Sequence, residues 1–288
     1  MHVGPPTPTF LECGIGYSEA MPALIAVDGS DLIYRVLNGP GEPVICLPGG
    51  PLRATRYLGN LGGLDEHRKL VMLELPRRRV DEVVGDLEAL RVHLGLERLD
   101  ILAHSASGNL AMLYAVAFPD RIGKLALVTP GLRAVGMQPT DEEFFASLER
   151  RSNEAWYAAA RRALDAIEDG DDSPANYLAA AAFQYGRWDE VAQCHAAGAS
   201  EEAIDGAAAI FYAEGAFDVL ATNAGLARLD ADVLIVVGEK DFLLTMMRGE
   251  QLAKLFPHAT MAVQEGAGHY PWIDGATEFV SIVSPFFI

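Results

Sequence analysis

Cysteine is scarce in this sequence, and its spacing excludes two classes of protein. The 288 residues contain three cysteines, Cys13, Cys46 and Cys194, which lie far apart and share no CxxC spacing. A disulfide framework or a zinc site needs closely and regularly spaced thiols. The odd number favours free thiols in a reducing compartment. We therefore expect neither a disulfide scaffold nor a metal site, and we expect a cytoplasmic location.

Positive charge and long apolar runs are also in short supply. The chain has 22 lysines and arginines against 40 aspartates and glutamates, which gives a formal charge of −18. Such a surface repels nucleic-acid phosphates and anionic lipid headgroups. No uninterrupted apolar run is long enough to cross a bilayer, and the N-terminus lacks the segments of a secretory signal. These absences predict no nucleic-acid and no membrane partner, and they leave the oligomeric state open.

Short apolar segments alternate with amphipathic stretches through most of the chain. Apolar residues in 80–94 recur at helical spacing, and Gly95 ends the pattern. Asp28-Gly29 predicts an antiparallel hairpin between the first two strands. Strands are predicted at 23–27, 31–37, 43–47, 68–75, 99–103, 124–128, 233–237 and 259–263, and helices at 80–94, 108–118, 246–256 and 272–287. This order implies βαβ crossovers and a mostly parallel sheet.

The alternation stops over residues 132–228. This stretch is helical in pattern, rich in alanine, glutamate and arginine, and contains no convincing strand. We therefore predict one α/β domain made of residues 1–130 and 229–288, with residues 131–228 inserted as a helical cap over one edge of the sheet.

A candidate nucleophile lies where the strand 99–103 runs directly into the next helix. The segment Ala103–Gly108 reads AHSASG, with Ser105 at its centre. A nucleophile in such a turn needs small residues two positions to either side, a requirement that Ala103 and Ser107 meet. Backbone N–H groups at the start of the helix, above all that of Ala106, can stabilise an oxyanion. The alternative is that the two serines only cap the helix.

Two further strand ends carry partners for such a nucleophile. Asp241 ends the segment GEKD after the strand 233–237, where a carboxylate can orient an imidazole. His269 lies in the glycine-rich segment EGAGHYPW after the last strand, where its ring can swing towards a nucleophile as a general base. Taken alone, Asp241 is equally well explained as a turn or helix-cap aspartate, and a lone loop histidine is usually just solvated. The order Ser…Asp…His on three separate strand ends favours a catalytic triad.

A fourth strand end supplies a second oxyanion donor. The strand 43–47 is followed by Pro48-Gly49-Gly50-Pro51. Two glycines let the backbone approach a substrate oxygen, and the Gly50 N–H is the expected donor. An ordinary Gly-Pro turn is the alternative.

Several other polar and aromatic residues are assigned structural roles. The side chain of His104 is expected to point away from the face that carries the nucleophile. His195 lies in helical sequence without metal-ligand spacing, and Tyr57 and Tyr185 are assigned to packing of the core or the cap. Acidic pairs such as Glu201-Glu202 are interpreted as solvated helix faces.

These four strand ends together resemble an α/β-hydrolase, and the resemblance covers nearly the whole chain. Within that superfamily, the GGP turn, the AHSASG, GEKD and EGAGHYPW segments and the helical cap are most similar to the proline iminopeptidase-like branch. In that family, glutamates of the cap bind the free amine of the substrate. The resemblance implies this role for Glu214, and a solvated glutamate is the alternative.

Three departures separate this chain from that branch. Pro48 stands where the family has the histidine of HGGPG, and Leu52 replaces the final glycine of that motif. After the strand 68–75, the family has an aspartate followed by an RGxGxS loop. This chain has the shorter segment ELPRRR at 74–79 instead. That loop shapes the floor of the pocket, so the substrate and the type of reaction stay open.

The sequence as a whole predicts a serine hydrolase without metal or cofactor. Ser105 would attack an ester, amide or thioester of a small-molecule substrate, His269 would accept and return the proton, and Asp241 would hold the imidazole. The altered turn and the short loop favour an alternative, a non-hydrolytic tailoring enzyme (a cyclase, lyase or acyltransferase) in secondary metabolism. A catalytically inactive binding protein that keeps the pocket is a third interpretation.

Overall fold

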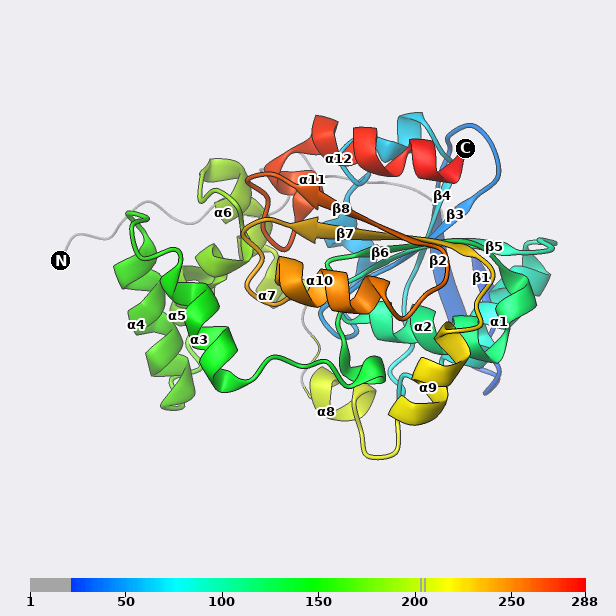
Figure 1. Cartoon of the computed structure of the whole chain (residues 1–288), viewed down its shortest axis with the longest axis horizontal. Coiled ribbons are helices and arrows are strands. Elements are labelled where there is room, and N and C mark those ends of the chain that lie inside the picture. Colours follow the sequence, from blue (N-terminus) through cyan, green and yellow to red (C-terminus); the bar gives the residue numbers. More distant parts are fainter. Residues whose placement is uncertain (1–21, 203, 205) are drawn as a thin grey trace.

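The chain is organised around an eight-stranded sheet (Figure 1). The computed structural model describes residues 22–288 apart from 203 and 205. The strand order is β1-β2-β4-β3-β5-β6-β7-β8. The strands are β1 (Ala23–Ile25), β2 (Asp31–Leu37), β3 (Val44–Leu47), β4 (Leu70–Leu73), β5 (Leu99–His104), β6 (Ile122–Val128), β7 (Asp232–Gly238) and β8 (Ala259–Gln264). The predicted hairpin of β1 and β2 is antiparallel, β2 is also antiparallel to β4, and all other neighbours are parallel.

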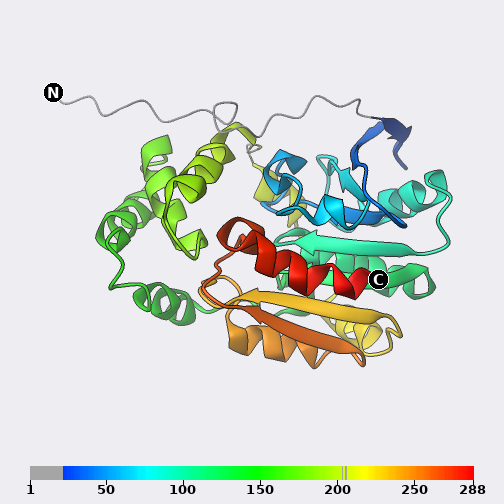
Figure 2. The ribbon, with the colours of Figure 1, turned by 90° about the horizontal axis from the view of Figure 1, so that it is seen from above.

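Helices cover both faces of this sheet (Figure 2). One face packs against α1 (Val84–His93), α2 (Ser107–Ala117), α9 (Val219–Leu226) and α10 (Met246–Ala253). The other face packs against the 3-10 helix η1 (Thr55–Leu58), α11 (Pro271–Asp274) and α12 (Ala276–Val283). The central strands are therefore buried on both sides, which is why they read as continuous apolar runs.

The helix that the sequence predicts over 272–287 is divided in the structure. A break at Gly275 separates α11 from α12. The carbonyl of Gly275 accepts a hydrogen bond of 3.0 Å from Gln264 Nε2, and a Cβ added at Gly275 would lie 2.8 Å from the same atom. The Gly275 carbonyl also accepts the N–H of Phe279, and the Gln264 side chain donates to the carbonyl of Pro271 as well, so it bridges the start of α11 and the break before α12.

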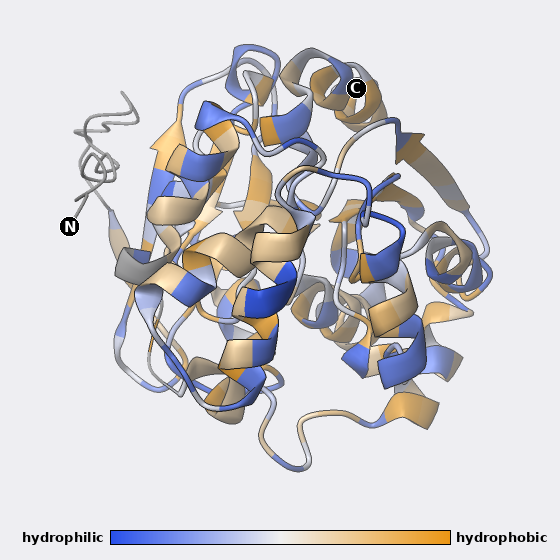
Figure 3. Ribbon diagram, turned by 90° about the vertical axis from the view of Figure 1, so that its left-hand side faces the viewer, coloured by the Kyte–Doolittle hydropathy of each residue, from blue (hydrophilic) through white to orange (hydrophobic). Residues whose placement is uncertain are grey.

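Only helices occur between β6 and β7 in the part of the chain that the structure describes. They are α3 (Asp141–Glu149), α4 (Tyr157–Glu168), α5 (Pro174–Ala180), α6 (Glu190–Ala197), α7 (Ala199–Glu202), α8 (Ala207–Phe211) and α9, with the 3-10 helices η4 (Arg133–Val135) and η5 (Ala181–Gln184). A capping box of Thr140 and Glu143 fixes the start of α3. Figure 3 shows both hydrophilic and apolar residues on these outer helices, the pattern of helices with one buried side.

These helices divide into two groups by their packing. The helices α3 to α5 surround a small cluster of their own that includes Leu148 and Phe183, beyond the ends to which β7 and β8 point (Figure 1). The helices α8 and α9 instead contribute Phe211 and Leu226 to the main core against the sheet. The division into a core and a cap at residues 131 and 228 stays a prediction, and this packing places α8 and α9 with the sheet.

The cysteines differ from the expectation of free thiols. Cys46 in β3 is a free, fully buried thiol, and burial raises its pKa. Cys194 in α6 is disulfide-bonded, so the prediction of a free thiol is wrong for this residue. Cys13 lies outside the described residues. The cysteines therefore no longer support the expected cytoplasmic location. Among the described helices, none has both the length and the apolar character needed to cross a membrane.

Candidate active site

Ser105 lies in a strained turn between β5 and α2. Its φ of +49° falls in the left-handed region, which residues other than glycine rarely adopt. The Ser105 N–H donates to the carbonyl of Val128 at 3.1 Å, and the Ser105 carbonyl accepts from the N–H groups of Gly108 at 2.9 Å and Gly131 at 2.7 Å. The main chain on three sides therefore holds the turn that presents the partly exposed Ser105 hydroxyl.

The structure brings Ser105, His269 and Asp241 together. His269 Nε2 lies 2.9 Å from Ser105 Oγ, and His269 Nδ1 lies 3.0 Å from Asp241 Oδ2. An ionised carboxylate only accepts hydrogen bonds, so Nδ1 carries the proton and Nε2 is free to accept from the serine hydroxyl. Asp241 and His269 are each 4% exposed, so little solvent competes for these bonds.

The loop that carries His269 is held more firmly than its glycines suggest. The His269 N–H donates to the carbonyl of Gln184 at 2.7 Å. The His269 carbonyl accepts from His104 Nε2 at 2.9 Å and from Thr129 Oγ1 at 3.0 Å. Three neighbouring segments therefore fix the backbone of the histidine, and its ring reaches Ser105 from this position.

The turn after β3 lies directly against the nucleophile. A Cβ added to Gly49 would lie 2.7 Å from the Cβ of Ser105, so this position needs glycine. The Gly49 N–H donates to the hydroxyl of Tyr57 at 2.6 Å. Among the described residues, no partner is found for the N–H groups of Gly50 and Ala106. These two predicted oxyanion donors are thus available to a ligand.

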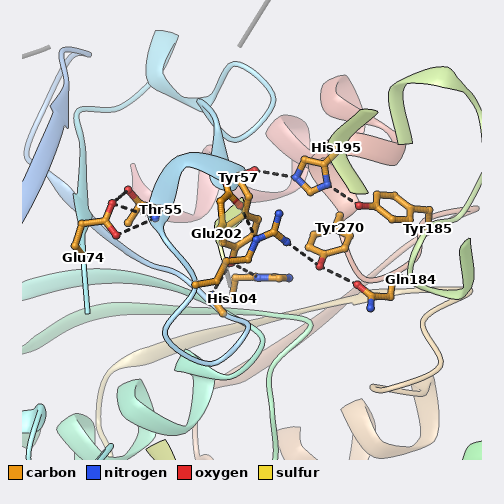
Figure 4. Close-up of polar contacts among 11 residues, drawn as sticks. Thr55, Tyr57, Glu74, His104, Gln184, Tyr185, His195, Glu202 and Tyr270 are labelled. Carbon is orange, nitrogen blue, oxygen red and sulfur yellow. Dashed lines mark hydrogen bonds and ion pairs between the residues drawn. The ribbon is translucent and has the colours of Figure 1, made fainter. Parts of the chain in front are cut away.

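Four residues with expected structural roles form tyrosine–histidine hydrogen bonds next to the turn after β3 and the loop of His269 (Figure 4). His104 does point to the face opposite to α2, but its Nδ1 lies 2.7 Å from the hydroxyl of Tyr57, whose ring packs beside Trp272 and Tyr270. On α6, His195 Nδ1 lies 2.7 Å from the hydroxyl of Tyr185. A histidine at the end of the strand LDILAH, directly before the candidate nucleophile, was an available sequence signal.

Glu202, expected on a solvated helix face, is 6% exposed, so that interpretation is wrong. Its Oε2 forms an ion pair of 2.7 Å with Nε of Arg53, three residues after Gly50, and the Arg53 guanidinium lies 4.1 Å above the ring of Tyr57. Glu202 therefore brings a carboxylate of the inserted segment to the turn after β3.

Glu214 lies elsewhere. It is exposed in the turn after α8, and its carbonyl accepts from Arg79 Nη1 at 3.2 Å. None of its described hydrogen bonds or ion pairs joins it to Ser105, Asp241 or His269. Its role in substrate binding stays a prediction.

Two buried histidines make the fold sensitive to acid. Burial, with the nearby positive charge of Arg53, lowers the pKa of His195 to about 3, and burial also lowers the pKa of His104 well below its usual range. As the pH falls through about 6.5, these histidines take up protons in the unfolded chain but stay neutral in the folded one, so stability is lost. From pH 7.5 to 5.5, each histidine is expected to lower the free energy of unfolding by about 1.4 kcal/mol.

Chemical denaturation at both pH values measures this loss, about 3 kcal/mol for the pair. His195→Gln should remove about half of the difference between the two pH values. His258→Gln, at a histidine with a 52% exposed side chain, serves as the control and should leave the difference unchanged. An equal pH dependence in the wild type and in His195→Gln would contradict a neutral, buried His195.

The fold and this arrangement of residues define the class of protein. The chain belongs to the alpha/beta hydrolase fold family, whose model matches residues 42–276. It is 31% identical over 142 residues to the AB hydrolase superfamily protein YclE of Bacillus subtilis, covering 43% of this chain and 48% of the relative. It is also 31% identical over 115 residues to 2-hydroxy-6-oxo-6-phenylhexa-2,4-dienoate hydrolase of Comamonas testosteroni, covering 35% of this chain and 40% of the relative.

A solved structure extends the likeness over nearly the whole fold. The proline iminopeptidase of Mycobacterium smegmatis superimposes with a TM-score of 0.67 at 22% identity, over 93% of this chain and 97% of the other. This agrees with the resemblance drawn from the motifs. The sequence matches to the two curated relatives cover less than half of either relative. The family model and the names of these relatives are those of hydrolases.

Proposed function

We propose that this protein is a serine hydrolase that cleaves an ester, amide or thioester of a small molecule through an acyl-enzyme. The observation that carries the proposal is the continuous hydrogen-bonded chain from Ser105 Oγ through His269 to Asp241. The strained Ser105 turn and the free N–H groups of Gly50 and Ala106 support it. A nucleophile, a base, an orienting acid and two oxyanion donors are the parts that acyl transfer requires.

In the proposed reaction, Ser105 Oγ attacks the substrate carbonyl while its proton passes to His269 Nε2. Asp241 stabilises the imidazolium that forms and keeps Nδ1 protonated. The N–H groups of Gly50 and Ala106 receive the developing oxyanion, each contributing on the order of 3 kcal/mol. The imidazolium then protonates the leaving group, and a water molecule, deprotonated by His269, releases the acyl group from Ser105.

Covalent labelling tests the nucleophile directly. A fluorophosphonate should phosphonylate Ser105 in the folded protein, with loss of fluoride, because His269 accepts the serine proton and the oxyanion donors stabilise the adduct. Peptide mass spectrometry should place one adduct per chain on the peptide that contains Ser105. Protein unfolded in urea is the control and should not be labelled. Label on another residue, or none at all, would overturn the proposal.

Product analysis separates hydrolysis from the non-hydrolytic alternative. Turnover of an aryl ester in water enriched in oxygen-18 should place the heavy oxygen in the acid product, because water attacks the acyl-enzyme. A cyclase, lyase or acyltransferase acting on the same acyl-enzyme would form a product without that oxygen.

A further inference from the structure

A buried series of hydrogen bonds runs from Gly49 in the turn after β3 through Tyr57 and His104 to the carbonyl of His269. Figure 4 shows its middle members, Tyr57 and His104. Its centre is Tyr57 in η1, which is 2% exposed and touches neither Ser105 nor Asp241 through a described hydrogen bond. We propose that Tyr57 is a positioning residue, whose hydroxyl holds Gly49 in place so that the Gly50 N–H meets the oxyanion. This inference rests on the proposed serine hydrolase function and adds a residue to it.

The donor and the acceptor of each hydrogen bond in this series can be assigned, starting from the carbonyl of His269. The carbonyl of His269 can only accept, so His104 Nε2, at 2.9 Å, must carry the ring proton. The second nitrogen, Nδ1, is then an acceptor in the neutral ring, and burial keeps the ring neutral by lowering the pKa of His104. The hydroxyl of Tyr57 therefore donates to Nδ1 at 2.7 Å. Its oxygen is left to accept the N–H of Gly49 at 2.6 Å.

This arrangement decides which glycine N–H in the turn is available to a ligand. Gly49 and Gly50 are adjacent in the turn. An N–H group that already donates to an acceptor in the protein is not available to a ligand. Because the Gly49 N–H is occupied by Tyr57, the Gly50 N–H is the one available. Gly49 also lies so close to Ser105 that a small movement of the turn changes the distance between oxyanion donor and nucleophile. Stabilisation of an oxyanion depends on such distances within a few tenths of an ångström.

The ring of Tyr57 is itself fixed from the inserted segment. His195 Nε2 lies 2.9 Å from the Tyr57 carbonyl, and because a carbonyl only accepts, Nε2 is the donor. The hydroxyl of Tyr185 then donates to His195 Nδ1. Arg53, paired with Glu202, lies over the ring. The helices between β6 and β7 thereby hold Tyr57, and Tyr57 holds the oxyanion turn. A tyrosine that only filled space would not need its hydroxyl.

Replacement of Tyr57 by phenylalanine removes the hydroxyl and keeps the ring. Tyr57→Phe is expected to lower the rate of acylation by a p-nitrophenyl ester about 10- to 100-fold, with KM changed less than about threefold, because ground-state binding does not use the oxyanion donors. The inhibition constant of an alkyl boronic acid, which forms a tetrahedral adduct on Ser105, should rise by a similar factor. A general disturbance of the site would raise KM as well, so the unchanged KM distinguishes lost oxyanion stabilisation from it.

Tyr34→Phe is the matched control. Tyr34 is 6% exposed, and its hydroxyl lies 3.1 Å from Nε2 of His93, so the variant also removes a tyrosine–histidine hydrogen bond but at a distance from the site. It should keep the acylation rate and the boronic acid affinity of the wild type. If Tyr57→Phe does not fold, His104→Phe keeps a ring but removes the acceptor of the tyrosine hydroxyl, and it should show the same two changes.

The outcomes separate this inference from the proposed function. A wild type that neither turns over esters nor binds the boronic acid overturns the serine hydrolase itself. A wild type that does both, together with a Tyr57→Phe variant that matches Tyr34→Phe in rate and affinity, overturns the positioning role alone. Equal losses in both tyrosine variants would also overturn it, since they would show a general effect of the missing hydroxyl.

Discussion

Replacing Ser105 by alanine is expected to lower kcat on an activated ester by about 10⁶-fold. In the proposed mechanism, Ser105 Oγ is the only atom that forms a covalent bond with the substrate, and His269 Nε2 has no other described side-chain partner. Alanine leaves the oxyanion donors and the binding site in place, so a weak acceleration over the uncatalysed reaction should remain. Steady-state turnover of a p-nitrophenyl ester, followed by release of the phenolate, measures the loss.

The fold should tolerate this substitution. Main-chain hydrogen bonds hold the Ser105 turn, and alanine at φ +49° is no more strained than serine. Thermal unfolding of Ser105→Ala should therefore follow that of the wild type. Ser281→Ala, at an exposed serine whose hydroxyl donates to the carbonyl of Glu278, is the matched control and should keep full turnover. Turnover by Ser105→Ala above about a tenth of the wild-type rate would refute acyl transfer to Ser105.

Asp241→Asn is expected to lower kcat by about 10⁴-fold while the side chain keeps its shape. One oxygen of Asp241 accepts the N–H of Leu243 at 2.8 Å, and the other accepts Nδ1–H of His269. The N–H of Leu243 requires an oxygen, so the amide of asparagine must turn its NH₂ towards the histidine. His269 Nδ1 then becomes an acceptor and Nε2 carries the proton. In that tautomer, Nε2 cannot take the proton of Ser105.

The pH profile distinguishes this explanation from a general disturbance. With the tautomer inverted, activity should recover partly in alkaline solution, where hydroxide can assist deprotonation of the serine, whereas a displaced loop would stay inactive at every pH. Asp230→Asn, at an aspartate with a fully exposed side chain, is the control and should match the wild type. If Asp241→Asn kept more than about a tenth of the wild-type kcat, Asp241 could not be the residue that orients His269.

Much of this site could be predicted because its residues follow the ends of short strands that the sequence itself indicates. Apolar residues recur with a period of two in strands and of 3.6 in helices, so both can be located in the sequence. The residues that follow the strands of a parallel sheet lie together at one edge of it. Ser105, Asp241 and His269 each follow a predicted strand, and the structure places them within hydrogen-bond distance. Gly50 and Ala106 follow from the same rule, since both adjoin strand ends.

The surroundings of the triad could not be predicted in the same way. Tyr57 and His104 are 47 residues apart, and His104 and His269 are 165 apart. No period or motif connects such pairs, so each residue alone is best explained as packing. Glu202 looks like a solvated glutamate until Arg53, 149 residues earlier, lies against it. The packing of the inserted helices could not be predicted for a related reason, because α8 and α9 differ from α3 to α5 in what they pack against, not in their sequence pattern.

The sequence by itself determined the mostly parallel sheet, its all-helical insertion and which residues end the strands, because these depend on local spacing and on chain order. The tertiary structure decided the tautomer of His104, the fixed loop of His269, the burial of Glu202 and the glycine whose N–H is free. Each of these depends on a hydrogen bond or ion pair between distant segments, and such partners exist only after the sheet has formed and its helices have packed.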